Sequence, residues 1–124
     1  MCGRFALTDC EEKIIYSFGI RNSRVILNPR YNISPSEKIP VILEKDGLLN
    51  LEFMKWGLIP FWSKLKTPLI NARIETLKEK PSFKHAINKR RCLVPSNGFY
   101  EWKKVKSTKQ PYFISMKNNY LFAF

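Results

Sequence analysis

The chain has 124 residues, 44% of them hydrophobic and 14% aromatic, which suits one domain with enough apolar side chains to bury a core. No stretch is long enough for a membrane span, and the charged residues from Arg4 onward are unlike a signal peptide, so we expect an intracellular protein with no membrane partner. Lys and Arg number 22 against 10 Asp and Glu, a net charge of +12 that favours nucleic acid as the partner; a merely solubilising basic surface is the alternative.

The N-terminal stretch "MCGRF" places Cys2 directly behind the initiator methionine. Small residues at this position generally permit removal of Met1. The chain would then begin with a 1,2-aminothiol, a free α-amine and a thiol on adjacent carbons. That pair has a chemistry that internal cysteines lack. The alternative is that Cys2 occupies this position by chance.

The first predicted helix spans residues 9–18. Thr8 to Glu11 have the form of a capping box, in which Thr8 caps the helix and Glu11 reaches back to it. Gly19 is a suitable C-terminal stop. The apolar face of this helix would carry Ile14, Ile15 and Phe18.

An extended loop is expected at residues 29–35, followed by a β-hairpin over residues 41–53. Asp46-Gly47 lies between two apolar runs, which is a strong hairpin signal. In the second strand apolar residues alternate with polar ones, which predicts one buried face formed by Leu49, Leu51 and Phe53.

The second half of the chain predicts a strand end and rigid loop at 54–62, a helix at 82–91, and strands at 92–95, 98–105, 111–116 and 120–124. Asn118-Asn119 tolerates positive φ and would join the last two strands in a tight turn. The pattern predicts an α+β fold with mainly antiparallel strands and two or three peripheral helices. Because the sequence stops inside an apolar strand, we expect a truncated domain with an open sheet edge at 120–124.

The cysteines predict neither a disulfide framework nor a metal centre. There are three, without paired spacing, and a single histidine, His85. A structural zinc site would need four nitrogen or sulfur ligands at suitable spacing. We therefore expect no metal and no cofactor, with Cys10 and Cys92 as packing residues.

Four stretches carry a resemblance to a known family: "MCGRF", "WGLIPFW" from Trp56, "INAR" from Ile70 with Glu75-Thr76 after it, and "RCLVPSNGFYEW" from Arg91. Together they resemble the SRAP domain, the SOS response-associated peptidase family of abasic-site processing proteins. The resemblance covers residues 1–124 and implies a single SRAP-type domain in its N-terminal portion. It also implies a β-rich, barrel-like fold with a basic channel across one face.

The resemblance implies a DNA-damage response protein that crosslinks to abasic sites in single-stranded DNA. After Met1 removal, the amine of Cys2 would form a Schiff base with the sugar aldehyde, and its thiol would close a thiazolidine ring. The partner would be single-stranded DNA, including single-strand/double-strand junctions, and the protein would be a cytoplasmic monomer, nucleoid-associated in a bacterium. The family's catalytic histidine belongs to the part that this chain lacks, so adduct formation would be slow or poorly reversible.

The family pattern also implies roles for individual side chains. Glu101 would transfer protons, with an ordinary outward-facing glutamate as the alternative. Asn71 would hydrogen-bond the adduct or opened sugar, with a turn-forming asparagine as the alternative. Positions that would hold phosphates or contact bases are Arg4, Arg73, Trp62 and Pro35.

Other residues are assigned to the core or the surface. Trp56, Phe99 and Trp102 are expected in the core, and core packing is equally open for Trp62. The basic run from Lys89 to Arg91 either extends a DNA track or is a solvated face. His85 is expected on a helix surface.

Two other functions remain open. The first is a non-catalytic single-stranded nucleic-acid binder that uses the same basic residues and aromatics. The second is a self-processing cysteine peptidase, in which Cys2 and Glu101 serve only to remove Met1.

Overall fold

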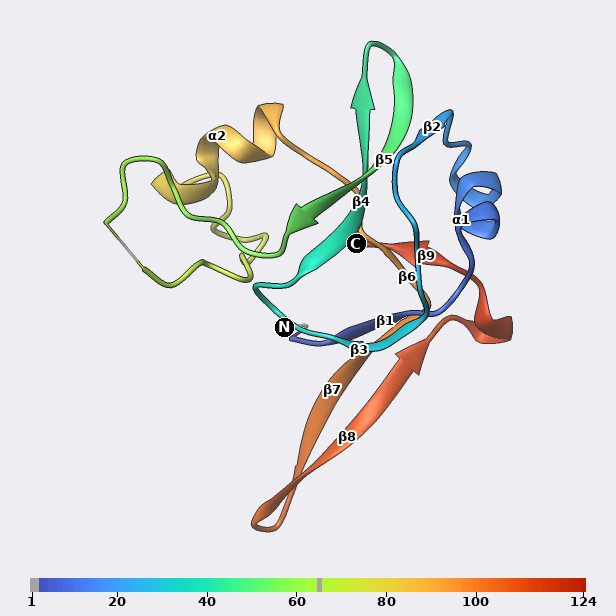
Figure 1. Cartoon of the computed structure of the whole chain (residues 1–124). Coiled ribbons are helices and arrows are strands. Elements are labelled where there is room, and N and C mark those ends of the chain that lie inside the picture. Colours follow the sequence, from blue (N-terminus) through green and yellow to red (C-terminus); the bar gives the residue numbers. More distant parts are fainter. Residues whose placement is uncertain (1–2, 65) are drawn as a thin grey trace.

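A computed structural model describes residues 3–64 and 66–124 (Figure 1). Figure 1 shows two hairpins, β4–β5 and β7–β8, that extend in different directions from the centre, with the helices at the periphery. The elements in chain order are β1 (Phe5–Leu7), α1 (Glu11–Phe18), β2 (Asn22–Ser23), β3 (Arg30–Ile33), β4 (Lys38–Lys45), β5 (Leu48–Lys55), α2 (Pro81–Lys89), β6 (Pro95–Ser96), β7 (Gly98–Val105), β8 (Thr108–Ser115), the 3₁₀ turn η1 (Lys117–Asn119) and β9 (Phe122–Ala123).

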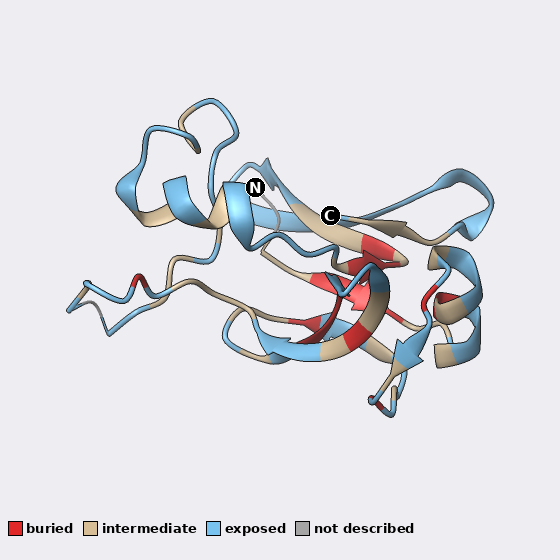
Figure 2. Ribbon diagram, turned by 90° about the horizontal axis from the view of Figure 1, so that it is seen from above, coloured by how far each residue is buried: buried red, intermediate tan, exposed pale blue. Residues whose placement is uncertain are grey.

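The strands form three sheets with the orders β3-β1-β7-β8, β2-β5-β4 and β6-β9. All pairs are antiparallel except β2 with β5. The predicted α+β fold is confirmed, but the strands of the described residues form separate sheets and no closed barrel. Buried residues gather where the sheets meet, whereas α2 contains only intermediate and exposed residues and the hairpin tips are exposed (Figure 2).

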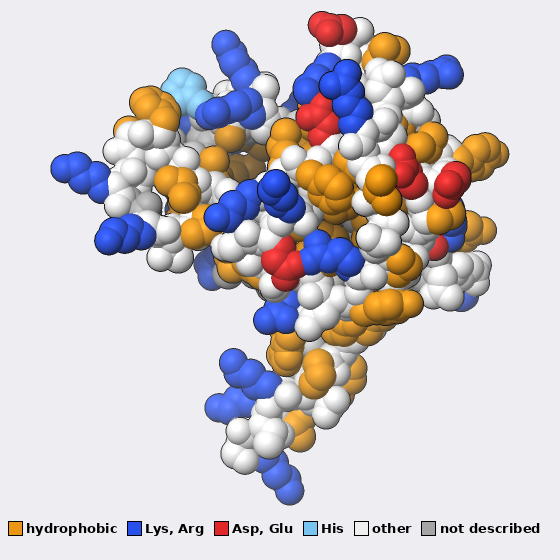
Figure 3. Space-filling model, in the orientation of Figure 1, with side chains coloured by type: hydrophobic (Ala, Val, Ile, Leu, Met, Phe, Trp, Pro, Cys, Tyr) orange, Lys and Arg blue, Asp and Glu red, His pale blue; other side chains and the backbone are white. Residues whose placement is uncertain are grey.

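The surface carries the excess of basic side chains that the composition predicts. Figure 3 shows Lys and Arg spread over the visible face, with fewer Asp and Glu among them. Some acidic groups are already paired with basic ones, as in the contact of 2.8 Å between Lys13 Nζ and Asp9 Oδ2. The net field of this face is therefore positive, which suits an anionic partner.

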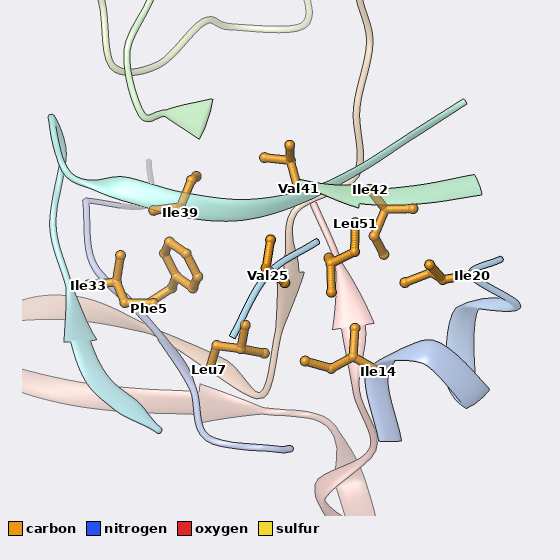
Figure 4. Close-up of a cluster of buried hydrophobic side chains, with 10 residues drawn as sticks. All are labelled: Phe5, Leu7, Ile14, Ile20, Val25, Ile33, Ile39, Val41, Ile42 and Leu51. Carbon is orange, nitrogen blue, oxygen red and sulfur yellow. The ribbon is translucent and has the colours of Figure 1, made fainter. Parts of the chain in front are cut away.

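The hydrophobic core lies between the sheets and α1 (Figure 4). Trp56 and Phe99 pack against it, as expected, but Trp102 is 43% exposed because β7 continues beyond the core. Cys10 and Cys92 are exposed, so their assignment as packing residues is wrong. The buried cluster contains Phe5, Leu7, Ile14, Ile20, Val25, Ile33, Ile39, Val41, Ile42 and Leu51.

The hairpin predicted around Asp46-Gly47 is confirmed. Both residues have positive φ, 53° and 75°, as a two-residue type I′ turn requires. The predicted buried face is only partly right, since Leu51 is fully buried but Phe53 is 44% exposed. Phe53 lies toward the end of β5, where it lines an open cavity instead of the core.

The start of α1 differs from the predicted capping box. The helix begins at Glu11, its N-cap is Cys10, and no side chain caps it. The amides of Thr8 and Asp9 instead donate to the side-chain oxygen of Asn97, over 2.8 and 3.2 Å. The predicted stop is confirmed, because Gly19 is the left-handed C-cap with φ 64°.

Two loop assignments also change. Residues 30–33, expected in a loop, form β3 and pair with β1. Asn118 and Asn119 have positive φ as predicted, 67° and 56°, but they lie within a 3₁₀ turn between strands of different sheets. β9 therefore pairs with β6 and not with β8.

Within the described residues, no helix has both the length and the apolar composition of a membrane span.

Candidate functional site

The first residues of β1 lie beside the middle of β7. Phe5 pairs with Phe99 in this antiparallel ladder, and the amide of Tyr100 donates to the carbonyl oxygen of Arg4 over 2.9 Å. Continuing the register by one residue brings Gly3 level with Glu101. Cys2 itself lies outside the described residues. The described structure therefore places Glu101 next to the backbone that leads to Cys2 in the sequence.

The turn "PSNG" before β7 holds this arrangement together. Ser96 is fully buried, and its hydroxyl lies 3.1 Å from the carbonyl oxygen of Ala6 and accepts the Gly98 amide over 3.1 Å. The Asn97 side chain accepts the two amides after β1 and donates to Asp9 Oδ2 over 2.9 Å. Sequence reasoning missed these roles because Asn-Gly is ordinarily a local turn signal.

Glu101 lies on the same face of β7 as Phe99, because side chains alternate along a strand. The Phe99 ring packs on the core and meets Phe124 with ring centroids 5.8 Å apart. Glu101 itself is half-buried and stands opposite Tyr112 of β8. A half-buried carboxylate at the edge of an apolar core is more consistent with a site residue than with an ordinary surface glutamate.

Asn71 reaches the same region from the long loop between β5 and α2. It is half-buried and lines a cavity of about 160 Å³ together with Phe5, Trp56 and Phe124. The Trp56 ring lies 5.5 Å from the Phe5 ring, and its Nε1–H donates to the carbonyl oxygen of Ile70 over 2.9 Å. Trp56 thus fixes the residue before Asn71 against the start of β1.

The "WGL" stretch at the start of the loop helps to bring Asn71 back to the sheet. Leu58 and Leu69 exchange two backbone hydrogen bonds of 2.9 Å, which closes the base of the loop. Gly57 has φ 134°, and a Cβ there would lie 2.7 Å from Cβ of Pro68, so only glycine fits. The glycine allows the loop to return to the sheet at Ile70 and Asn71.

Pro35 belongs to a turn that contacts the same tryptophan. The amide of Ser36, which follows Pro35, donates to the carbonyl oxygen of Trp56 over 2.9 Å, and the Trp56 amide donates to Glu37 over 2.9 Å. Arg30 forms an ion pair with Glu37 and fixes the turn from β3. Pro35 is half-buried beside this junction.

The residues predicted to contact phosphates or bases do not all lie in one place in the structure. Arg4 points to the outer face of the four-stranded sheet, where its Nη1 donates to Asn32 Oδ1 over 2.9 Å. Arg73 is exposed in the irregular turns before α2. Trp62 is 56% exposed and its neighbour Phe61 is 93% exposed, so the core alternative for Trp62 is wrong. Trp62 is therefore free of the core at the surface of its loop.

The remaining titratable groups give little sign of a metal site. No three His, Cys, Asp or Glu side chains within residues 3–64 and 66–124 are grouped as metal ligands. His85 is exposed on α2, as expected. Cys92 is exposed but lines an apolar groove, and partial desolvation there raises the pKa of its thiol above the ordinary value. Arg90 and Arg91 are exposed and line an apolar groove between α2 and β4.

The arrangement brings Asn71, Glu101 and the Pro35 turn around the first residues of β1. A carboxylate can transfer protons and an amide can both donate and accept hydrogen bonds. The side chains of Glu101 and Asn71 can therefore assist a reaction at an atom near the N-terminus of the chain.

Comparison with known proteins gives a consistent result. The profile of the family described as "SOS response associated peptidase (SRAP)" matches residues 1–124. The "Abasic site processing protein YoaM" of Bacillus subtilis is 41% identical over 100% of this chain and 57% of its own length. The "Abasic site processing protein YedK" of Escherichia coli is 38% identical over 92% of this chain and 53% of its own length.

A solved structure shows the same fold. The crystal structure of a protein from Bacteroides thetaiotaomicron superimposes with a TM-score of 0.83 at 32% identity, covering 98% of this chain and 57% of that protein. The chain thus spans between half and three fifths of the length of these relatives.

Proposed function

This chain belongs to the SOS response associated peptidase (SRAP) family, and on that premise we propose that it processes abasic sites in DNA by forming a covalent crosslink through Cys2. The observation that supports the proposal most strongly is the convergence of Asn71 and Glu101 on the start of β1. The names of the relatives support the abasic site as the substrate. Residues 1–124 act in this proposal as the N-terminal portion of a single SRAP domain.

The proposed reaction begins with removal of Met1, because the α-nitrogen of Cys2 is otherwise an amide and cannot attack. An abasic deoxyribose opens to an aldehyde at C1′. An α-amine has a pKa of about 8, so a useful fraction is unprotonated at neutral pH. The amine adds to the aldehyde to give a carbinolamine, which loses water to form the imine.

Ring closure then protects the link. The thiolate of the same residue adds to the imine carbon, and the imine nitrogen takes up a proton, which yields a five-membered thiazolidine. Both nucleophiles belong to one residue, so closure has a high effective molarity. The product is a stable DNA–protein adduct that shields the lesion.

Glu101 and Asn71 have separate parts in this scheme. Glu101 gives a proton to the hydroxyl that leaves the carbinolamine and assists opening of the sugar. Asn71 hydrogen-bonds the opened sugar oxygen. In this proposal the half-buried position of both groups limits the access of bulk water, which would hydrolyse the imine.

Single-stranded DNA is the proposed partner, including the single strand beside a duplex junction, and the protein acts as a monomer in the cytoplasm. Arg4 and Arg73 bind phosphates, whereas Trp62 and Pro35 contact bases beside the lesion. The 56% exposure of Trp62 supports a stacking role, since a stacking platform must be accessible. The net charge of +12 supplies the long-range attraction.

A non-covalent single-stranded DNA binder is the second candidate, supported by the same charge and aromatics. Cys2→Ala separates the two. The covalent proposal expects the variant to bind an abasic oligonucleotide with wild-type affinity and to form no denaturation-resistant adduct. An adduct of undiminished yield with Cys2→Ala contradicts the assignment of Cys2. A wild-type chain that binds and never crosslinks supports the binder.

A further inference from the structure

The outer face of the β7–β8 hairpin carries aromatic and basic side chains that have no part in the proposed site. The register pairs Tyr100 with Phe113, Trp102 with Pro111 and Lys104 with Lys109. Alternation places all six side chains on one face of the two strands, the face opposite Phe99 and Glu101. We define these six residues as the hairpin face.

The half of this face that is farther from the hairpin tip is an exposed aromatic platform. The Tyr100 ring lies 5.0 Å from the Phe113 ring and 6.5 Å from the Trp102 ring. Trp102 is 43% and Phe113 is 49% exposed, although clusters of this kind are ordinarily buried. The Tyr100 hydroxyl donates to the carbonyl oxygen of Tyr31 over 2.8 Å, which ties the platform to β3.

The tip of the same face is basic. Lys104 and Lys109 stand directly opposite each other, an arrangement that destabilises a free hairpin because like charges repel across a strand pair. From residue 102 to residue 124 the sequence contains five lysines and no Asp or Glu. Figure 3 shows the hairpin as a protrusion with hydrophobic side chains along its length and Lys toward its tip. An anion placed between the two ammonium groups reduces the repulsion between these lysines.

We propose that the hairpin face is a binding track for single-stranded nucleic acid, with bases stacked on Trp102 and Phe113 and a phosphate held between Lys104 and Lys109. The positive charge favours a polyanion as the ligand, and the adjacent aromatic rings favour a polyanion whose flat bases can stack on them. The track adjoins Arg4, a proposed phosphate contact, because the amide of Tyr100 donates to the carbonyl oxygen of Arg4; Glu101 lies on the opposite face of β7. The choice of nucleic acid rests on the proposed function.

The test uses an oligonucleotide of thymidines without an abasic site, so that no adduct can form. Affinity is measured by fluorescence anisotropy over a series of salt concentrations. The Lys104→Gln/Lys109→Gln variant is compared with Lys103→Gln/Lys117→Gln, which removes the same charge from positions outside the hairpin face. Loss of the one phosphate held between these lysines is expected to reduce the slope of log affinity against log salt by about 0.7 units. Equal slopes and affinities for both double variants would overturn the proposal.

Trp102 supplies the second arm. Trp102→Ala is expected to weaken binding about five- to hundredfold, the range for loss of one stacked base, and Trp102→Phe to restore most of it. Unchanged affinity of Trp102→Ala contradicts the track. The same holds if the variant abolishes self-association in analytical ultracentrifugation without any loss of affinity, because the face would then be an interface between copies. Adduct formation on an abasic oligonucleotide is measured separately, so the two proposals fail independently.

Discussion

The amide of Tyr100 donates to the carbonyl oxygen of Arg4 over 2.9 Å, and this bond sets the register by which Glu101 faces the start of the chain. A shift of one residue would turn Glu101 to the outer face and bring Tyr100 inward. The fully buried Ser96 and the Asn97 side chain fix that register from the preceding turn. The candidate site therefore depends on an interaction between residues far apart in the sequence.

Replacement of Glu101 tests the proposed proton transfer. Glu101→Gln keeps the shape of the side chain and removes its acid–base function, so the rate of adduct formation is expected to fall about 10²- to 10⁴-fold. Single-turnover crosslinking at saturating abasic oligonucleotide measures this rate. Noncovalent affinity for the same DNA is the control and should change little. A wild-type rate contradicts the assignment.

The same variant tests self-processing. If Glu101 takes part in Met1 removal, Glu101→Gln retains Met1 whereas the wild type loses it. Intact mass of both purified chains decides this point before any DNA is added. Crosslinking rates are then compared only between chains that both begin at Cys2.

Trp56 is predicted to act as a positioning residue. Trp56→Phe removes the N–H that donates to the carbonyl oxygen of Ile70, so Asn71 loses its fixed place beside Phe5. Loss of one hydrogen bond costs about 1 kcal/mol of the free energy of unfolding. We expect the maximal crosslinking rate to fall and the half-saturating DNA concentration to stay nearly constant. A purely structural role would lower stability and leave the maximal rate unchanged.

Gly98 is predicted to be irreplaceable at the start of β7. A Cβ at this position would lie 2.3 Å from Cζ of Phe113 and 2.7 Å from the carbonyl oxygen of Ile114. Gly98→Ala should therefore lower the free energy of unfolding by about 2 kcal/mol or more in urea denaturation. Gly3→Ala is the matched control, because nothing lies within 4 Å of its Cβ position. Equal stability of the two variants contradicts the packing described for Gly98.

Cys92 gives a prediction about pH. Desolvation raises the pKa of its thiol, so the thiolate forms only at a pH above that of an ordinary cysteine. Alkylation of Cys92 by iodoacetamide, followed by peptide mass spectrometry, should therefore be slower than that of a reference peptide at pH 8. Its rate should rise through a midpoint at higher pH. A midpoint equal to that of the peptide contradicts the desolvation of Cys92.

Local patterns in the sequence predicted the elements whose signals are local. Asp46-Gly47 gave the turn of β4–β5, and residues 98–105 form β7 with the predicted bounds. The capping box failed because the amide groups near Thr8 bond to Asn97, 89 residues away. A contact between residues so far apart in the sequence is not predicted by local propensities.

The candidate site was only partly accessible from the sequence. The motifs identified Asn71 and Glu101, but the contacts that hold them, from Trp56 and Ser96, depend on tertiary structure. Alternation also predicted which strand residues share a face, yet it could not tell whether that face is covered. Trp102 shows the difference, since its apolar side chain was assigned to the core and is exposed.

The central claim is that the chain crosslinks an abasic site through Cys2, and intact-protein mass spectrometry tests it most directly. The protein is measured before and after incubation with a single-stranded oligonucleotide that carries one abasic site. We predict loss of Met1, followed by a stable mass increase equal to the oligonucleotide less one water, located on the N-terminal peptide. A chain that begins at Cys2 and binds the oligonucleotide without any mass increase would contradict the claim.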